Sequence, residues 1–263
     1  MSLSKMTIAE IKAQLASVDD SKAEEFLWLM ERDGRAGLRS LALSWSRRKE
    51  RLAQEERRRH ELTKYERNLG AQGFSLVAGV DEAGRGALAG PLVAGAVILP
   101  ENTGLHGLRD CKRLTPEQRD SLFEPIKETA RAWHIIAIDA VLIDANGIQW
   151  ANLHALEQAV LGLTPQADYV LSDAFALPSL DTPHLAITKG DNLSLTIAAA
   201  SVLAKVTRDR TMVEQHRLYP QYGFDKHKGY GTDDHCRALE EYGPSPIHRL
   251  YFEPVAKVRQ LNF

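Results

Sequence analysis

Two acidic residues, Asp81 and Glu82, directly follow an apolar run at residues 75–80 that is typical of a buried β-strand. The next four residues, 83–86, hold an arginine between two glycines. Carboxylates at the end of a strand can bind hard divalent cations, which prefer oxygen ligands. Glycines let the backbone approach a ligand closely. The pattern therefore predicts metal-assisted chemistry on a substrate that contains phosphate.

Two further acids, Asp173 and Asp191, follow shorter apolar segments. Loops at strand ends converge in an α/β sheet, so these acids could share one small volume with Asp81 and Glu82. Such acids repel one another unless protons or cations neutralise them, and a pair of divalent ions roughly 3.5–4 Å apart would also clamp a phosphate. Adjacent strand residues point to opposite faces, so we expect the strand to end at Asp81 and Glu82. The alternative is that each acid is an ordinary turn or cap residue.

Composition restricts the class of protein. The chain has 263 residues, of which 44% are hydrophobic and 26% are charged, as in a folded globular protein. No apolar run has the length of a membrane span, and the N-terminal residues lack the apolar core of a signal peptide. Cys111 and Cys236 are far apart and neither lies in a CxxC pair, which argues against a disulfide framework and a zinc site. We therefore expect a cytoplasmic protein, and a monomer in the absence of any contrary pattern.

The chain divides into a predicted N-terminal helical extension, residues 1–72, and a predicted catalytic domain, residues 73–263. Thr7 and Ser21 each begin a sequence of the capping-box type, and residues 38–69 lack proline and glycine, which predicts one long helix. Between positions 47 and 67 this helix carries nine basic and five acidic residues. A solvated face with salt bridges and an extension of a duplex-binding face both remain open.

Strands alternate with helices from residue 75 onward, which predicts an α/β sheet covered by helices. Thr115 and Gln118 form a further capping box, with a proline at the first helical position. The expected strands are 75–81, 91–99, 133–138, 169–171 and 185–188, and the longer expected helices are 146–163 and 193–216.

Residues 79–91, GVDEAGRGALAGP, resemble the signature of the type 2 ribonucleases H, specifically of bacterial ribonuclease HII. The arginine of this string separates it from the related ribonuclease HIII. The N-terminal helices look like the extension of some bacterial members, and the resemblance covers about residues 75–256. Further blocks agree in the same order: residues 110–115, 189–191, 197–209, 227–232 with His235, and 246–254.

The resemblance implies a ribonuclease H-like mixed sheet flanked by helices. It also implies an endonuclease that cleaves the RNA strand of RNA–DNA hybrids and incises duplex DNA 5′ to a single embedded ribonucleotide, leaving 3′-hydroxyl and 5′-phosphate ends. By position, the catalytic and metal-binding acids would be Asp81, Glu82, Asp173 and Asp191, with Mg²⁺ or Mn²⁺. Of these, Asp81 would bridge two ions, one activating water and one stabilising the leaving 3′ oxygen.

The resemblance also implies substrate contacts. Backbone groups of Gly84, Arg85 and Gly86 would detect the 2′-hydroxyl, which distinguishes ribose from deoxyribose. Tyr230 would pack on the sugar at the RNA-to-DNA junction; without the motif, a buried core tyrosine is the alternative. Candidate phosphate contacts, each of which could instead be a surface charge, are Lys112, Lys228 and Arg249.

The sequence departs from the family pattern in places that leave the four acids intact. Cys111 replaces the usual serine and Arg113 stands where lysine is common, and a thiol is a poorer hydrogen-bond donor than a hydroxyl. Asp173 is followed by Ala174 instead of the common glycine, and Tyr251 replaces a small hydroxyl residue.

Other interpretations are a catalytically silent hybrid-binding protein, which the intact acids disfavour, and a phosphatase for small substrates, which leaves Tyr230 unexplained. His235 and His248 are expected to be structural hydrogen-bonding groups or phosphate neighbours, because their spacing does not suit zinc. The C-terminal residues loosely resemble peptides that bind the bacterial sliding clamp, although apolar tails more often pack on their own domain. They are Gln260, Leu261, Asn262 and Phe263.

Overall fold

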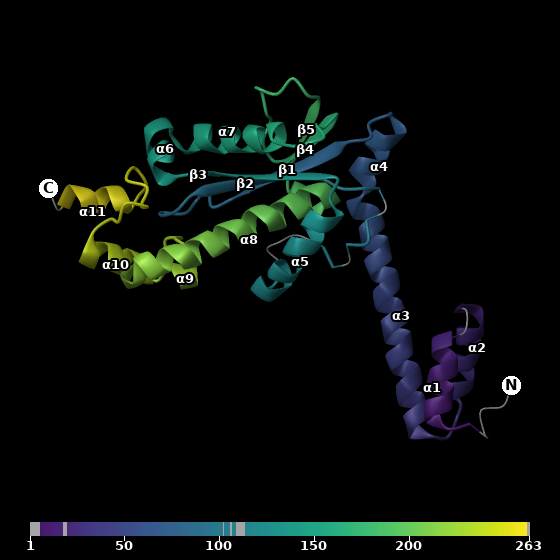
Figure 1. The fold of residues 1–263 in the computed structure, drawn as a ribbon. Coiled ribbons are helices and arrows are strands. Elements are labelled where there is room, and N and C mark those ends of the chain that lie inside the picture. The colour runs from purple at the N-terminus through teal and green to yellow at the C-terminus, as the bar shows by residue number, and fades with distance from the viewer. Residues whose placement is uncertain (1–5, 18–19, 102, 106, 109–113, 262–263) are drawn as a thin grey trace. The chain divides into compact units, whose positions relative to one another are not determined.

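The computed structural model describes residues 6–17, 20–101, 103–105, 107–108 and 114–261, and Figure 1 shows the elements they form. Contacts within the chain divide it into two units, residues 1–60 and 61–263, and each is described by itself. Among the described residues, no helix combines the length and the apolar character that a membrane crossing requires.

The first unit is helical and has a small core of its own. Thr7 caps its first helix as predicted, because the Thr7 N–H donates to the Glu10 carboxylate at 2.8 Å and the Glu10 N–H donates to the Thr7 hydroxyl at 3.3 Å. The second helix begins at Asp20, so Ser21 lies inside it and the predicted start at Ser21 is wrong. Fully buried side chains of the core are Ile11, Met30, Leu38 and Ala42. The helices are α1 (Ile8–Ser17), α2 (Asp20–Glu31) and α3 (Ala36–Leu62).

The second unit alternates strands and helices, and its capping box at Thr115 is present with both hydrogen bonds. In chain order its elements are α4 (Lys64–Ala71), β1 (Val77–Ala83), β2 (Leu92–Ile98), α5 (Pro116–Thr129), β3 (Ala132–Ile138), α6 (Ala140–Asn146), α7 (Ile148–Leu161), β4 (Tyr169–Asp173), β5 (His184–Ile187), η3 (Gly190–Asn192), α8 (Leu195–Leu218), η4 (Pro220–Tyr222), α9 (Phe224–His227), α10 (Asp233–Tyr242) and α11 (Val255–Leu261).

The strands of the described residues form one five-stranded mixed sheet in the order β3-β2-β1-β4-β5. β2 pairs antiparallel with β1 and β3, whereas β4 pairs parallel with β1 and β5. Helices α6 and α7 cover one face, and α5 and α8 cover the other (Figure 1). Apolar side chains of both helix layers complete separate cores against the sheet. The predicted mixed sheet flanked by helices is confirmed.

Helix α8 lies directly against the backbone of the sheet. A Cβ atom added to Gly79 in β1 would lie 2.1 Å from the carbonyl carbon of Thr196, and one added to Gly95 in β2 would lie 2.9 Å from the carbonyl oxygen of Ala200. No side chain fits at such distances. The two glycines and the small residues of α8 therefore set the spacing between helix and sheet at the centre of the fold.

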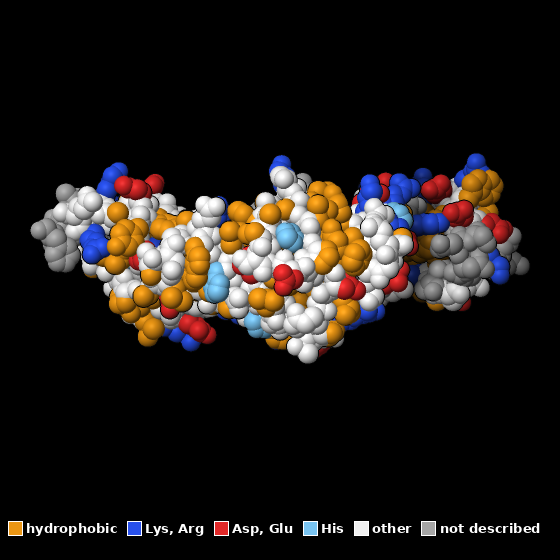
Figure 2. Space-filling model, turned by 90° about the horizontal axis from the view of Figure 1, so that it is seen from above, with side chains coloured by type: hydrophobic (Ala, Val, Ile, Leu, Met, Phe, Trp, Pro, Cys, Tyr) orange, Lys and Arg blue, Asp and Glu red, His pale blue; other side chains and the backbone are white. Residues whose placement is uncertain are grey.

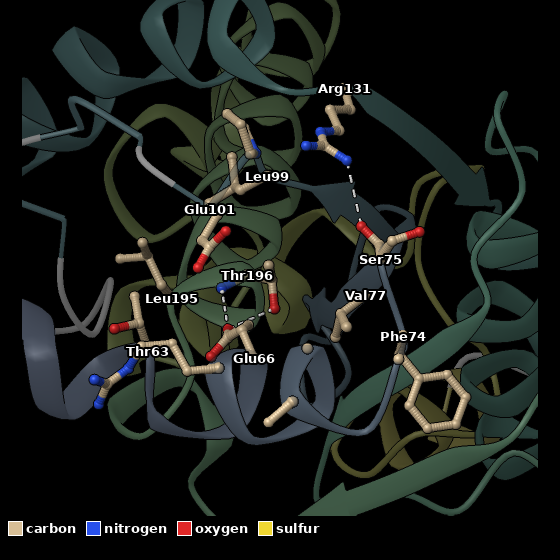
Figure 3. A pocket seen from close by; sticks show the side chains of 15 residues that line it. Thr63, Glu66, Phe74, Ser75, Val77, Leu99, Glu101, Arg131, Leu195 and Thr196 are labelled. Atoms are coloured by element: carbon tan, nitrogen blue, oxygen red, sulfur yellow. Dashed lines mark hydrogen bonds between the residues drawn. The ribbon is translucent and has the colours of Figure 1, made fainter.

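The predicted helix over residues 38–69 is wrong, because α3 ends at Leu62 and a separate helix, α4, follows. The Glu66 carboxylate of α4 accepts a hydrogen bond from the Ser194 hydroxyl at 2.7 Å. It also accepts bonds from the Thr196 hydroxyl and N–H at 2.9 and 3.0 Å, and Figure 3 shows these two residues. These bonds fix α4 against the first turn of α8, about 130 residues further along the chain. Local sequence could not reveal so distant a partner.

The same anchor forms one wall of a cavity of about 580 Å³, shown in Figure 3. Arg131 donates to the Ser75 carbonyl oxygen at 3.3 Å across another wall. The cavity lies at the N-terminal end of β1, where Val77 lines it, whereas Asp81 and Glu82 lie near the other end of the same strand. It is therefore separate from the predicted site.

Three non-glycine residues of the described chain have left-handed φ angles: Ala174 at 61°, Lys189 at 59° and Lys228 at 53°. Ala174 directly follows Asp173, and each of the two lysines comes two residues before another predicted site residue. A side chain in this conformation costs on the order of 1–3 kcal/mol, and such strain is most frequent at functional sites.

We predict that Ala174→Gly stabilises the protein by about 1 kcal/mol, because glycine adopts the left-handed conformation without steric cost while gaining some freedom in the unfolded chain. Urea unfolding of the metal-free protein measures the change. The matched control is Ala145→Gly at an exposed position of α6, where loss of helix propensity should destabilise by about 1 kcal/mol. A destabilised Ala174→Gly protein would contradict the presence of strain.

Candidate active site

Asp81 and Glu82 both lie inside β1, which continues to Ala83. The expectation that the strand ends at these acids is wrong: they pair with Gly95 and Ala94 of β2. Their side chains consequently leave opposite faces of the sheet. Asp81 lies on the α8 face, where only 6% of the residue is exposed, and Glu82 is half-buried.

The Asp81 carboxyl is in an environment that opposes its charge. Burial raises its pKa well above the usual range, and the neighbouring charges of Glu82 and Asp173 raise the pKa further. Two hydrogen bonds act in the opposite direction, one from the Ser201 hydroxyl of α8 and one from the Glu82 N–H at 2.8 Å. Asp81, Glu82 and Asp173 therefore lie close enough to influence one another electrostatically.

Parallel pairing of β1 with β4 brings Asp173 to this edge of the sheet. Val80 pairs with Ser172, so Asp81 and Asp173 are the next residues on neighbouring strands. The Asp173 carboxylate accepts a hydrogen bond from the Gly190 N–H at 2.7 Å, which brings it to the residue directly before Asp191.

Asp191 lies in the short helix η3 and is 1% exposed. The Asn192 side chain donates to its carboxylate at 3.1 Å. Lys189, with its left-handed backbone, turns the chain into η3 immediately before Gly190. The bond between Asp173 and Gly190 therefore ties the β4 end to the segment that carries Asp191.

The chemistry of these four groups fits a hard divalent cation, because all donors are carboxylate oxygens and a buried member has a raised pKa that a cation would reverse. Among the described residues, no group of three or more His, Cys, Asp or Glu side chains has the spacing of a complete metal site. The acids are thus gathered at one edge of the sheet without closing around a common point.

Ser201 is a member of this region that sequence reasoning missed as a functional residue. It lies in a run of small residues in α8, and its hydroxyl donates to the Asp81 carboxylate. Its spacing from the acids along the chain carries no signal. Only the contact of α8 with Gly79 and Gly95 brings Ser201 over β1.

The loop after β1 is shaped by glycine and by buried arginines. Gly84 has φ +91°, and a Cβ atom there would lie 1.9 Å from Nε of Arg208, so only glycine fits. Gly86 has open space on its Cβ side, and the exposed Arg85 places its guanidinium 5.2 Å from the ring of Phe175. The backbone at positions 85 and 86 is therefore open to a ligand.

Arg249 is fully buried, which differs from the surface position expected of a phosphate contact. It donates to the Gly90 carbonyl oxygen at 3.1 and 3.0 Å and to the Arg85 carbonyl oxygen at 2.9 Å. Burial is the main cause that lowers the pKa of Arg249 to about 9, and the positive charge of Arg208 is the second. This placement supports a role in shaping the loop, and direct contact with phosphate has no support from it.

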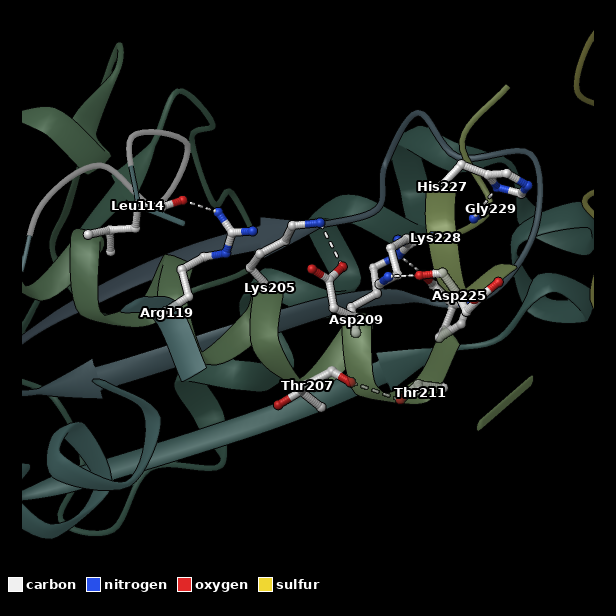
Figure 4. Close-up of polar contacts among 12 residues, drawn as sticks. Leu114, Arg119, Lys205, Thr207, Asp209, Thr211, Asp225, His227, Lys228 and Gly229 are labelled. Atoms are coloured by element: carbon white, nitrogen blue, oxygen red, sulfur yellow. Dashed lines mark hydrogen bonds and ion pairs between the residues drawn. The ribbon is translucent and has the colours of Figure 1, made fainter. Parts of the chain in front are cut away.

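Tyr230 is 37% exposed, so it is not the buried core tyrosine considered as the alternative. Its ring lies 5.2 Å from the guanidinium of Arg208 and 5.7 Å from the ammonium of Lys205. Lys228, two residues earlier, donates to the Asp225 carbonyl oxygen (Figure 4). Lys112, Cys111 and Arg113 lie outside the described residues.

A groove of about 940 Å³ runs from Tyr230 between α5, α8 and α9. Lys205 and Arg210 in its wall are paired with Asp209 at 2.6 Å and Asp120 at 2.7 Å, and Figure 4 shows the first pair. Further basic side chains in the wall are Arg119, Arg217, Lys226 and Lys228. Because basic groups outnumber acidic ones, the groove suits an anionic strand.

The opposite face of the sheet lacks this character. Helices α6 and α7 contain no lysine or arginine, and hydrophobic side chains are exposed along them (Figure 2). Val141 and Leu161 are 69% and 51% exposed. The charge distribution of this unit therefore favours the α5–α8 side for contact with a phosphate backbone.

Comparison with solved structures supports the class of fold. The ribonuclease H2 of Pyrococcus horikoshii OT3 is similar with a TM-score of 0.61 and 27% sequence identity, over 70% of this chain and 97% of that one. The mixed sheet, with acids near the C-terminal ends of adjacent parallel strands, thus places the fold in the ribonuclease H-like class.

Sequence comparison narrows the class. The model of the ribonuclease HII family matches residues 78–255, and the model of the ribonuclease HII N-terminal domain matches residues 7–70. The ribonuclease HII of Bacillus licheniformis is 45% identical over 95% of this chain and 97% of its own length, and that of Pelotomaculum thermopropionicum is 46% identical over 96% of both. The chain belongs to the ribonuclease HII family, whose members cleave RNA in RNA–DNA hybrids. The predicted family and enzyme class are confirmed.

We predict that Asp81→Asn raises the free energy of unfolding of the metal-free protein at pH 7. In the native state Asp81 keeps its proton at pH values where the unfolded chain has already lost it. The free energy of unfolding therefore falls as pH rises from the ordinary pKa of the acid to the raised one. The asparagine side chain does not titrate, so the variant does not lose stability over this pH range. Thermal unfolding in a chelator, with and without added Mg²⁺, measures it, and Mg²⁺ should stabilise the wild type more than the variant.

The control is Asp181→Asn, which replaces an exposed acid and should change neither quantity. A wild type that is more stable than Asp81→Asn in chelator at pH 7 would contradict the electrostatic description of the site.

Proposed function

We propose that this enzyme incises duplex DNA on the 5′ side of a single embedded ribonucleotide, in addition to cleaving the RNA strand of RNA–DNA hybrids, and leaves 3′-hydroxyl and 5′-phosphate ends. The observation that carries the proposal is the meeting of two features at one edge of the sheet. Mutually repelling acids lie there around Asp81, and the open backbone of residues 84–86 follows them directly.

We assign cation binding to Asp81, Glu82, Asp173 and Asp191. Glu82 is included although it leaves the opposite face of β1, because its charge still acts on Asp81. When bound there, a pair of Mg²⁺ or Mn²⁺ ions would lower the pKa of an attacking water and stabilise the leaving 3′ oxygen. The side chains supply the negative charge that retains such ions, and the Ser201 hydroxyl orients the Asp81 carboxylate. No histidine has to act as general base in this scheme.

Recognition of the ribonucleotide is assigned to two loops. The N–H groups at positions 85 and 86 are suited to the 2′-hydroxyl, since the space beside Gly86 is open and Arg249 holds the Arg85 carbonyl away from it. The half-exposed ring of Tyr230 would pack on the next sugar and disfavour a 2′-hydroxyl there. The basic groove that begins at Tyr230 would hold the strand beyond the junction.

Residues 1–72 are proposed to be an extension of the catalytic domain at residues 73–263, and this boundary stays a prediction. The cytoplasmic location and the monomeric state also stay predictions.

We predict that a duplex with one ribonucleotide is nicked on its 5′ side when Mg²⁺ or Mn²⁺ is present, and that a continuous hybrid is cut in parallel. Asp81→Asn should abolish both reactions. Ser201→Ala removes only a partner of the acid, so it should reduce the rate by roughly 10–100-fold, the usual cost of losing an outer partner of a metal ligand. Denaturing gels of end-labelled strands resolve the products.

Binding of the duplex without nicking, at any concentration of either metal, would reject the proposal in favour of a silent hybrid-binding protein. Cleavage of small phosphate esters in place of either duplex would favour the phosphatase interpretation.

A sliding-clamp interaction through Gln260, Leu261, Asn262 and Phe263 is proposed separately; Asn262 and Phe263 lie outside the described residues. Deletion of these four residues should abolish retention by an immobilised bacterial clamp. The cleavage rate should stay within about twofold, because Gln260 is exposed and none of the four residues has an assigned part in the chemistry. Equal retention of the shortened chain, or no retention of the full chain, would reject the interaction.

A further inference from the structure

Three histidines gather beside Tyr230 and take no part in the chemistry assigned above. His235 and His248 are buried, with 0% and 2% exposure, and their ring centres lie 5.2 Å apart. The ring of His227 stacks on that of His235 at 4.5 Å. Aromatic rings of Tyr222 and Phe224 pack against this cluster. Polar rings enclosed in this way require specific hydrogen-bond partners.

The hydrogen bonds of the cluster run in one direction. The Ser245 N–H donates to Nδ1 of His248 at 2.9 Å, so a neutral His248 must carry its proton on Nε2. That Nε2 lies 2.9 Å from Nε2 of His235, which must therefore accept. His235 is left with its proton on Nδ1, 3.0 Å from the Tyr230 carbonyl oxygen, to which it donates. The bonds form a relay from Ser245 through both histidines to Tyr230.

His227 fixes the other side of the same peptide segment. Its Nδ1 accepts from the Gly229 N–H at 3.2 Å, its Nε2 donates to the Tyr222 carbonyl oxygen at 2.7 Å, and its own carbonyl oxygen accepts from the Tyr230 N–H at 3.0 Å. Both backbone groups of Tyr230 are thus held by this cluster. Burial lowers the pKa of His235 to about 4 and that of His248 to about 3, so both rings are neutral near pH 7.

The segment before Tyr230 is bonded to the loop that follows β1. The Gly229 carbonyl oxygen accepts from the N–H groups of Leu88 and Ala89 at 2.8 and 3.3 Å. The Ile247 carbonyl oxygen accepts from the Gly90 N–H at 2.8 Å. Movement of the Tyr230 peptide would therefore disturb the backbone that leads back to Gly84 and Gly86.

We propose that His235 and His248 are positioning residues whose directed hydrogen bonds set the Tyr230 peptide, and with it the register between the tyrosine and the loop at residues 84–90. This inference rests on the proposed role of Tyr230 at the RNA-to-DNA junction. The relay determines how well the enzyme distinguishes a junction from a continuous hybrid, whereas the acids determine whether either is cut.

Amide side chains test the direction of each bond, because asparagine places its polar atoms near Nδ1 of histidine and glutamine near Nε2. His235→Asn retains a donor for the Tyr230 carbonyl, and His235→Gln loses it. At His248 the order reverses, since His248→Gln retains the donor to His235 and His248→Asn does not. Simple filling of space would favour glutamine at both positions, because it is closer to histidine in volume.

The measurement is kcat and KM for a duplex with one ribonucleotide and for a continuous RNA–DNA hybrid. We expect the preference for the junction, as a ratio of kcat/KM values, to be about three- to tenfold lower for His235→Gln than for His235→Asn, and likewise lower for His248→Asn than for His248→Gln. Equal ratios within each pair, or better performance of glutamine at both positions, would overturn the proposal.

Nitrogen NMR of the labelled wild type tests the histidine tautomers directly and does not require any variant to fold. The expected tautomers are Nδ1–H for His235 and Nε2–H for His248, and Nε2–H at His235 would overturn the relay. If the wild type fails to nick the single-ribonucleotide duplex, the proposed function fails instead. The tautomers would still show whether the relay exists.

Discussion

The backbone contact between α8 and the centre of the sheet is the constraint on which the site depends. At Gly79 and Gly95 the helix lies where no side chain could be inserted, so the two layers are closer than ordinary side-chain packing allows. This proximity buries Asp81 and brings Ser201 within hydrogen-bonding distance of its carboxylate. An acid that water would otherwise solvate is thereby kept in an environment that favours a proton or a cation.

Acidic and basic side chains near the end of β1 are stabilised in different ways. The acids near the C-terminal ends of β1 and β4 repel one another, and their repulsion is a cost of folding that a cation would remove. The buried guanidiniums of Arg208 and Arg249 instead donate to carbonyl oxygens of the loop after β1. Positive charge thus lies beneath the loop and negative charge beside it. A phosphodiester with bound cations would be complementary to both.

Much of the architecture followed from local pattern, and the site did so only in part. The strands and the cap at Thr115 depend on nearby residues, so the sequence indicated them to within a few positions. The position of α4 against α8 depends on Glu66 and its distant partner Thr196, and the burial of Arg249 depends on carbonyl groups about 160 residues away. Spacing alone proposed the four acids as a group, and the family motif supplied their roles. Neither indicated Ser201 or the direction of the histidine bonds, because both arise from packing.

The glycines at positions 79 and 95 also limit which substitutions this protein can tolerate. A methyl group at position 79 would be accommodated only if the start of α8 withdrew from β1, and Ser201, further along that rigid helix, would move with it. A mutation remote from the phosphate would then act on the acid through a shift of the whole helix. A substitution at either position would consequently change stability and turnover together. Substitutions elsewhere in the core must also preserve the contact between α8 and these two glycines.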